Sequence, residues 1–143
     1  MNSAELICKV ECQELIARYF NILDSGPRTD AVELFTQDGR MFVTGDKEGA
    51  PPAEMFAGLP PQFVPVHLAT NVVITPAGPD AAEGIAYAVA YNIFGGADDA
   101  LPRRMPPTPS RIGRVQFSFK RTPAGWRISA FRPLTAYIDD GHT

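Results

Sequence analysis

In residues 81–94, AAEGIAYAVAYNIF, large and small side chains alternate from position 83 to position 93. A period of two is typical of a β-strand, in which successive side chains point to opposite faces of a sheet. The large side chains of one face are Ile85, Tyr87, Val89, Tyr91 and Ile93, and the small ones of the other are Ala86, Ala88, Ala90 and Asn92. The small face indicates that a bulky element, such as a helix, packs closely against this strand.

Further segments with strand character lie on both sides of this stretch. Residues 67–75 alternate in polarity and precede a Pro-Gly turn, and residues 111–122 are joined to 126–137 by a second short turn. Tight turns of this kind connect antiparallel neighbours. A shorter strand is predicted at 40–44, after the Asp38-Gly39 turn. The sequence therefore predicts an antiparallel sheet in the C-terminal part of the chain.

Helical patterns come first in the chain. Residues 4–24 carry an apolar stripe at helical spacing, and Gly26-Pro27 ends the pattern because proline cannot continue a helix. A second helix is predicted from Thr29 to Phe35, and a helical turn or two at 53–57. Helices and strands that are segregated along the chain mark an α+β domain, and a length of 143 residues fits one domain spanning 1–143.

Composition excludes several classes of partner. A net charge of −3 and a pI near 5.3 give no basic surface, so neither nucleic acid nor membrane is an expected partner. No signal peptide precedes the first helix, which makes a cytoplasmic location the expectation. Neither a phosphate-binding glycine loop nor a cluster of metal ligands occurs, so no cofactor and no metal are expected. Cys8 and Cys12 are interpreted as small buried side chains.

Several motifs together resemble the SnoaL-like domains of the nuclear transport factor 2-like superfamily. Residues 15–26, LIARYFNILDSG, are similar to the first helix of these domains, and 33–39, ELFTQDG, to the second helix and its turn. His67-Leu68-Ala69-Thr70-Asn71 resembles their His-x-x-x-Asn strand, and 121–128 the closing hairpin. The likeness covers most of the chain, with 45–62 its weakest part.

The resemblance implies a fold and a range of reactions. The expected architecture is a curved antiparallel sheet with N-terminal helices that together form a cone-shaped, cystatin-like pocket. Relatives include ketosteroid isomerases, scytalone dehydratases and polyketide cyclases, besides non-catalytic binding modules. Tyr19 matches a pocket tyrosine and His67 a pocket histidine of such enzymes. Phe20 and Phe42 stand where the dehydratases and the isomerases, respectively, have a carboxylate.

His67 and Tyr19 are the candidate catalytic residues. Imidazole exchanges protons near neutral pH, and His67 is the only histidine outside the C-terminal tail. The phenol of Tyr19 could polarise a substrate oxygen, or be a core aromatic whose hydroxyl meets water. Asn71 lies about 13 Å further along the strand and either binds the other end of a ligand or satisfies backbone groups. Asp24 is interpreted as a turn or capping residue.

The remaining candidate ligand-binding residues are aromatic: Phe20, Phe42, Tyr87, Tyr91 and Trp126. The two tyrosines share one face of the 81–94 strand and line either the pocket or a homodimer contact. Arg103 and Arg104 belong either to a solvated loop or to a lid that grips an acidic ligand. The first functional hypothesis is a cofactor-independent isomerase, dehydratase or cyclase for a small apolar or polycyclic ketone or alcohol. The alternative is a non-catalytic binding module for a hydrophobic small molecule or a partner subunit.

Overall fold

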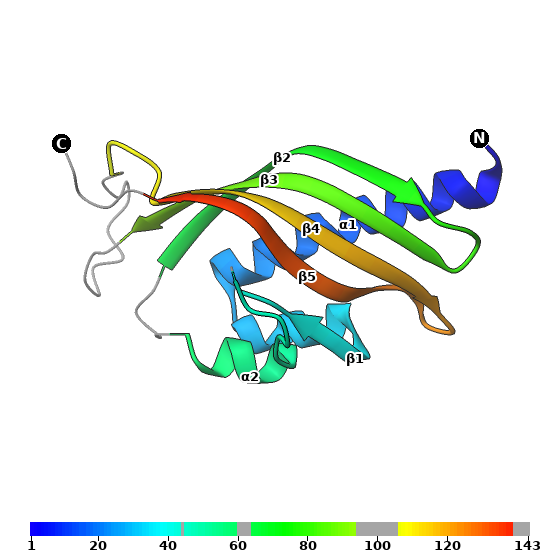
Figure 1. Cartoon of the computed structure of the whole chain (residues 1–143), viewed down its shortest axis with the longest axis horizontal. Coiled ribbons are helices and arrows are strands. Elements are labelled where there is room, and N and C mark those ends of the chain that lie inside the picture. Colours follow the sequence, from blue (N-terminus) through cyan, green and yellow to red (C-terminus); the bar gives the residue numbers. More distant parts are fainter. Residues whose placement is uncertain (44, 60–63, 94–105, 139–143) are drawn as a thin grey trace.

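The alternating stretch forms strand β3, Ala81–Ile93, which lies between β2, Val64–Pro76, and β4, Arg111–Thr122 (Figure 1). The structure is a computed structural model, and it describes residues 1–43, 45–59, 64–93 and 106–138. The predicted positions of Arg103 and Arg104 lie outside these described residues. β5, Gly125–Ile138, follows β4 in an antiparallel hairpin, as the sequence predicts.

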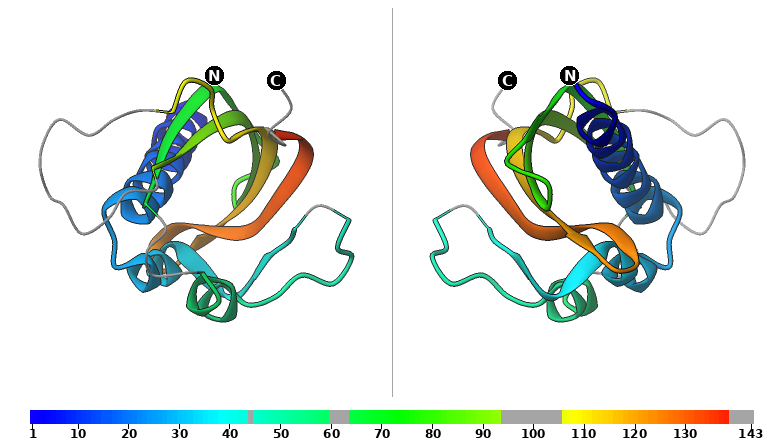
Figure 2. Two further views of the ribbon diagram at one scale, coloured as in Figure 1. Left: turned by 90° about the vertical axis from the view of Figure 1, so that its left-hand side faces the viewer. Right: turned by 90° about the vertical axis from the view of Figure 1, so that its right-hand side faces the viewer.

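The first helix, α1, spans Ser3–Ser25 and is fixed at its start by a capping box between Asn2 and Glu5. Its buried face is the predicted stripe, which comprises Cys8, Cys12, Leu15, Ile16, Tyr19 and Phe20. Viewed from the end, the strands curl and α1 lies along their concave side (Figure 2). The prediction of a helix over the N-terminal stretch is confirmed, and both cysteines are buried and free.

The small face of β3 allows α1 to approach closely. Ala82 and Ala86 are completely buried there. Gly84 has no room for a side chain, because an added Cβ would lie 2.9 Å from both Ile74 Cδ1 and Phe119 Cε2. The concave side of β3 is therefore the face of small residues, and its tyrosines lie on the convex side.

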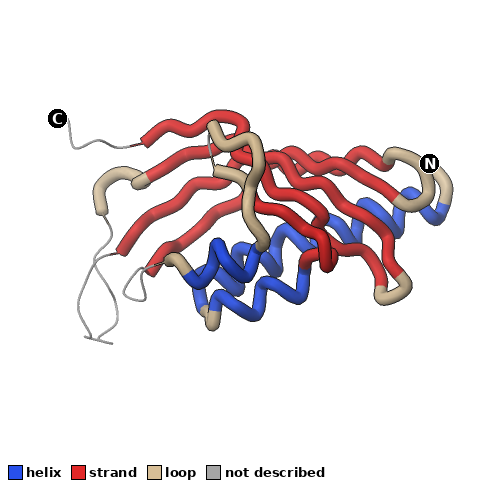
Figure 3. Tube along the Cα trace, turned by 60° about the horizontal axis from the view of Figure 1, so that its bottom comes forward, coloured by secondary structure: helices blue, strands red, loops and turns tan. Residues whose placement is uncertain are grey.

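The order of the strands is β1-β5-β4-β3-β2, and the pairing is antiparallel from β2 to β5. β1, Phe35–Met41, pairs in parallel with β5, so the sheet is mixed rather than wholly antiparallel. β1 also begins earlier than the predicted strand at 40–44. The second predicted helix is a 3-10 helix, η1, Arg28–Leu34, and a short helix α2, Pro52–Ala57, follows β1. Figure 3 shows the helices in blue below the strands of the sheet, and Figure 1 labels α2 and the edge strand β1.

A bulge changes which side chains of β2 face inward. The register with β3 shifts between Thr70 and Val73, and Asn71 there adopts a left-handed φ of 55°. Asparagine tolerates this conformation better than most residues. Beyond the bulge Val73 is exposed and Ile74 is buried, so the strict alternation predicted for 67–75 is wrong in its second half. Bulges of this kind also bend a strand, and β5 has two more.

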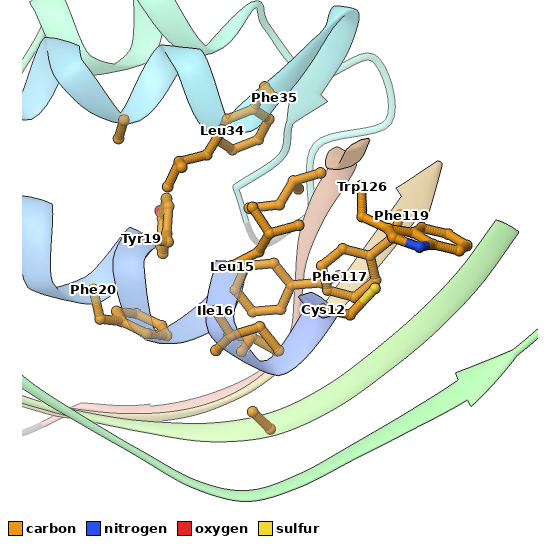
Figure 4. Close-up of a cluster of buried hydrophobic side chains, with 14 of the residues drawn as sticks. Cys12, Leu15, Ile16, Tyr19, Phe20, Leu34, Phe35, Phe117, Phe119 and Trp126 are labelled. Atoms are coloured by element: carbon orange, nitrogen blue, oxygen red, sulfur yellow. The ribbon is translucent and has the colours of Figure 1, made fainter. Parts of the chain in front are cut away.

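The core between α1 and the sheet is rich in aromatic rings (Figure 4). Phe117 and Phe119 of β4 are stacked with centroids 6.0 Å apart, and both are completely buried. Trp126 and Ile128 of β5 pack in the same cluster. This end of the concave face is filled by side chains, which leaves the other end of the sheet as the place for a cavity.

The convex face of the sheet is apolar and exposed. Cross-strand neighbours pair Leu68 with Val89 and Val66 with Tyr91, and Tyr87 lies beside them. Val66, Leu68 and Tyr87 are all exposed, as is Tyr137 on β5. None of the described helices is both long and apolar enough to cross a membrane.

Candidate functional site

A cavity of about 630 Å³ opens at the end of the concave face that aromatic side chains do not fill. Its walls come from the helices α1, η1 and α2 and from the strands β1, β2, β4 and β5. The lining residues are Tyr19, Leu23, Arg28, Met41, Phe42, Val43, Met55, Phe56, Leu59, Pro65, His67, Arg111, Phe131, Pro133, Ala136 and Ile138. Because most of these side chains are apolar, the cavity suits a hydrophobic molecule with few polar groups.

A smaller compartment of about 120 Å³ adjoins this cavity over the floor of the sheet. Its floor consists of Ala88 and Ala90 of β3 and Gly113 of β4. Tyr19 and His67 line both spaces, so the two predicted catalytic residues share one hollow. The structure thus brings these two side chains together, while the catalytic role of each stays a prediction.

His67 is held by Asp24, which lies in the last turn of α1. The Asp24 carboxylate accepts a hydrogen bond from the His67 backbone N–H at 2.8 Å and contacts His67 Nδ1 at 2.5 Å. The side chains are 14% and 23% exposed for His67 and Asp24, respectively. Because a carboxylate only accepts, Nδ1 carries the hydrogen of this bond and Nε2 is left for a ligand.

Asp24 was not predicted from the sequence to be part of the site. Its carboxylate neither caps a helix nor closes a turn but crosses to β2. One signal was available in the sequence. An acidic side chain in the last turn of a helix opposes the helix dipole, and α1 has no basic residue there to compensate. A carboxylate in such a place is most stable with a partner from elsewhere in the fold.

Phe20 restrains the other side of the imidazole. The ring centroids of Phe20 and His67 lie 5.0 Å apart, and Phe20 lines the smaller compartment. Where the dehydratases have a carboxylate after the tyrosine, this chain therefore has a ring packed on its histidine. The acid in this site comes from Asp24 instead, five positions after Tyr19.

Tyr19 is 3% exposed and is surrounded by five aromatic rings. Burial raises the pKa of its phenol well above the ordinary range for tyrosine. Within the described part of the chain, its hydroxyl forms no hydrogen bond. The side chain is therefore a neutral hydrogen-bond donor in the wall of an apolar cavity.

Phe42 also lines the cavity, and the guanidinium of Arg132 lies 4.0 Å from the centre of its ring. The cation fixes this ring from outside by a cation–π contact. Phe42 stands where the isomerases have their base, so it contributes apolar surface and no proton transfer at that point of the wall.

Four predicted ligand-binding residues lie away from this cavity. Asn71 is exposed at the bulge of β2, and Tyr87 and Tyr91 lie on the convex face. Trp126 is buried at the filled end of the core, beside a separate groove against α1. Contact of these four with a ligand in the cavity would need another arrangement of the chain, because the sheet or the aromatic core lies between.

Arg28 and Arg111 line the cavity and were not among the predicted residues. They lie far apart in the sequence, at the start of η1 and of β4, where no local pattern marks them. Among the described residues, no three His, Cys, Asp or Glu side chains gather as a metal site would require.

Solved structures with the same architecture place this fold among known proteins. A protein from Kribbella flavida matches with a TM-score of 0.74 and 26% identity, over 96% of each chain. An NTF2-like protein with a cystatin-like fold from Novosphingobium aromaticivorans matches with a TM-score of 0.68 and 25% identity, over 97% of this chain and 87% of that one. The predicted α+β, nuclear transport factor 2-like architecture is confirmed.

A proposed scytalone dehydratase from the same organism has a TM-score of 0.72 over all of this chain and 95% of its own, with 14% identity. At that identity the likeness shows the fold alone. Comparison with curated proteins finds no match. The sequence model of the SnoaL-like domain matches residues 4–132, and this chain therefore belongs to the SnoaL-like domain family.

Proposed function

We propose that this protein is a cofactor-independent isomerase, dehydratase or cyclase for a small apolar or polycyclic ketone or alcohol. The Asp24–His67 pair in the wall of the apolar cavity is the observation that carries the proposal. The three reactions share one step, the removal of a proton from carbon beside a carbonyl group. A positioned histidine can perform this step without a cofactor.

In the proposed step His67 Nε2 takes the proton, and the electron pair of the broken C–H bond moves toward the carbonyl oxygen. The imidazole becomes positively charged at that moment. Asp24 stabilises this charge through Nδ1, and its bond to the His67 backbone fixes the ring. The proton is then returned at another carbon in an isomerisation, or to a departing hydroxyl group in a dehydration.

Tyr19 is proposed to stabilise the enolate oxygen that forms in this step. Since burial raises the pKa of its phenol, the group stays protonated and can donate a hydrogen bond. It lines the same two compartments as His67. The surrounding aromatic rings exclude water, which strengthens a hydrogen bond to a developing negative charge.

Exchange of carbon-bound hydrogen with solvent tests the proposal before the substrate is identified. A panel of cyclic and aromatic ketones would be incubated with the protein in D₂O, and deuterium uptake measured by mass spectrometry. We expect uptake into at least one ketone class, and a loss of roughly 100-fold or more in His67→Gln. The matched control is His142→Ala, since His142 is the other of the two histidines. Equal exchange by wild type and His67→Gln would refute the role of His67.

The alternative is a binding module that holds a hydrophobic molecule without turning it over. The observation in its favour is the composition of the wall, whose described lining residues are apolar apart from Tyr19, His67 and two arginines. A ligand that copurifies unchanged, together with no exchange in any ketone, would support this alternative.

We also propose that the protein forms a homodimer through the convex face of the sheet. Val66, Leu68 and Tyr87 are exposed there side by side, and an apolar patch of this kind marks an interaction surface. Sedimentation equilibrium should give a dimer for wild type and a monomer for Leu68→Asp. A monomeric wild type would contradict this proposal and leave the catalytic one intact.

A further inference from the structure

Gly113 is a buried glycine of β4 that neither its backbone nor its packing requires. Its φ lies outside the left-handed region that favours glycine. A Cβ added at this position would lie 3.5 Å from the nearest atom, the carbonyl oxygen of Thr135, which is ordinary van der Waals contact. Glycine weakens a strand and often marks a place where a ligand approaches the backbone closely.

Gly84 of β3 shows the opposite case, a glycine that packing requires. A Cβ there would lie 2.9 Å from both Ile74 and Phe119, which is closer than Cβ atoms approach other atoms in proteins. The space above Gly84 is therefore filled by side chains of the core. The space above Gly113 belongs to the smaller compartment, so its missing side chain leaves a hollow open and makes no room for a neighbouring side chain.

Gly113 belongs to a row of small residues that crosses four strands. It pairs with Ala88 of β3 and with Ala136 of β5, and Ala88 pairs in turn with Ala69 of β2. Ala88 and Gly113 line the smaller compartment, and Ala136 lines the larger cavity. These three residues form a floor about 10 Å wide, since it spans two strand spacings. No side chain of this floor is larger than a methyl group.

The helix α1 forms the opposite wall of the smaller compartment through Tyr19, Phe20 and Leu23. Tyr19 is 3% exposed, and its hydroxyl forms no hydrogen bond within the described part of the chain. Among the described residues, the hydroxyl of Thr36 is the one fully enclosed side-chain hydroxyl without a partner. The hydroxyl of Tyr19 therefore reaches open space. Because buried polar groups are hydrogen-bonded as a rule, it indicates a ligand that supplies the missing partner.

The volume of the smaller compartment limits what can enter it. Its volume is about 120 Å³, and a cavity of roughly 150 Å³ binds one benzene ring. The compartment therefore has room for a single ring and no more. The remainder of a larger ligand would lie in the adjoining cavity of about 630 Å³.

We infer that Gly113, together with Ala88, determines the specificity of the site. The missing side chain leaves the height that a flat ring needs to lie between the floor and α1, beside His67 and Tyr19. The inference rests on the proposed function, because it names the residues that select the substrate at the same site. The class of substrate is a ketone with flat fused rings. Saturated rings of the same skeleton are puckered and too thick for this compartment.

Isothermal titration calorimetry with 2-acetylnaphthalene and 2-acetyl-trans-decalin tests the class of ligand. The two ketones share the acetyl group and the ten-carbon skeleton, and they differ in the thickness of their rings. We expect wild type to bind 2-acetylnaphthalene roughly tenfold or more tightly, since overpacking of a close-fitting space costs free energy on that scale. Burial of apolar surface alone would favour the saturated ketone, which is the more apolar of the two. Equal affinities, or tighter binding of the saturated ketone, would overturn the inference.

Gly113→Ala tests the residue, because binding and stability should change in opposite directions. The added methyl group should weaken 2-acetylnaphthalene about tenfold or more. The melting temperature should stay the same or rise by about 1–4 °C, because alanine is less costly than glycine in a strand. The matched control is Gly84→Ala, which should lower the melting temperature and leave the affinity within about twofold. Unchanged affinity in Gly113→Ala, or melting below wild type, would overturn the inference, since the glycine would then serve packing.

Ala88→Val tests the same floor from the neighbouring strand. It adds two carbons to the compartment, and valine suits a strand, so the protein should fold and bind 2-acetylnaphthalene at least tenfold more weakly. Unchanged affinity would contradict the floor. Binding and exchange in D₂O are separate measurements. Binding that depends on the floor without exchange that depends on His67 refutes the catalytic role alone, and exchange by Gly113→Ala at the wild-type rate refutes the floor alone.

Discussion

The two ends of the concave face share the same strands and differ in how large and small side chains meet. At the filled end, the small residues Ala82 and Gly84 of β3 pair with Phe119 and Phe117 of β4. At the open end, Ala88 of β3 pairs with Gly113 of β4, so a small residue lies beside another small residue. The first combination gives a solid core under α1, and the second leaves a hollow.

This difference shows that the position of the cavity depends on which residues of neighbouring strands are paired. The sequence of a single strand does not determine it. β3 presents small residues to α1 at both ends, and its sequence alone does not tell the ends apart. The register with β4 decides, because it places phenylalanine at one end and glycine at the other. Changes of side-chain volume should therefore have opposite consequences at the two ends.

The largest expected effect comes from removing volume at the filled end. Phe117→Ala deletes a completely buried ring that contacts Tyr19, Phe119 and Phe131. We expect the free energy of unfolding to fall by about 3–5 kcal/mol, the usual cost of such a cavity. Urea denaturation followed by circular dichroism measures it. A loss below about 1 kcal/mol would mean that this end is not tightly packed.

Adding volume should separate the two ends. Ala86→Leu inserts three carbons where the side chain is completely buried, and overpacking should cost about 1–3 kcal/mol of unfolding free energy. Ala90→Leu adds the same carbons to the open compartment and should cost less than about 1 kcal/mol. Similar destabilisation by the two substitutions would contradict the contrast between the ends.

Hydrogen-bonded carboxylates at the two ends should also differ in what they contribute to the free energy of unfolding. Asp24→Ala removes the acceptor of two hydrogen bonds in a half-buried place, and we expect a loss of about 1–2 kcal/mol. The control is Asp80→Ala, which breaks an ion pair with Arg121 that is more than half exposed at the filled end. Such surface pairs contribute about 0–1 kcal/mol. Thermal denaturation of both variants compares them, and a larger loss for Asp80→Ala would refute the ranking.

The smallest effect near neutral pH is expected for Tyr19→Phe, because the hydroxyl forms no hydrogen bond in the described part of the chain. At alkaline pH the variant should differ more. Burial raises the pKa of Tyr19 in the folded protein, so the unfolded chain loses this proton first and stability falls as pH rises above the ordinary range of tyrosine. Tyr19→Phe should lack this part of the fall. Phenolate formation can be followed by absorbance as the pH is raised. If all four tyrosines ionise together at a pH below that at which the protein unfolds, the raised pKa of Tyr19 is contradicted.

Much of the fold could be predicted from the sequence because it follows from local patterns. The α1 stripe, the small face of β3 and the β4–β5 hairpin are each encoded by neighbouring residues. The parallel pairing of β1 with β5 could not be predicted, since it joins segments some ninety positions apart (residues 35 and 128). The prediction that Asn71 shares a strand face with His67 failed for a related reason. The bulge that turns Asn71 outward depends on the register of β2 with β3.

The candidate site was predicted only in part. His67 and Tyr19 could be predicted from their chemistry and from the family resemblance. Asp24 and Arg111 could not, because only the folded chain brings them to the site. Asp24 meets His67 across 43 positions of the chain. Arg111 meets the same site through Ala90, by way of two strand pairings.

The protonation of the His67 ring tests the central claim most directly, and it requires no substrate. Nitrogen-15 NMR of the imidazoles should show His67 with hydrogen on Nδ1 and a bare Nε2 above neutral pH, with His142→Ala used for assignment. In Asp24→Leu this preference should disappear, because the acceptor at Nδ1 is gone. Hydrogen on Nε2 in the wild-type protein would contradict a base that faces the cavity with Asp24 behind it.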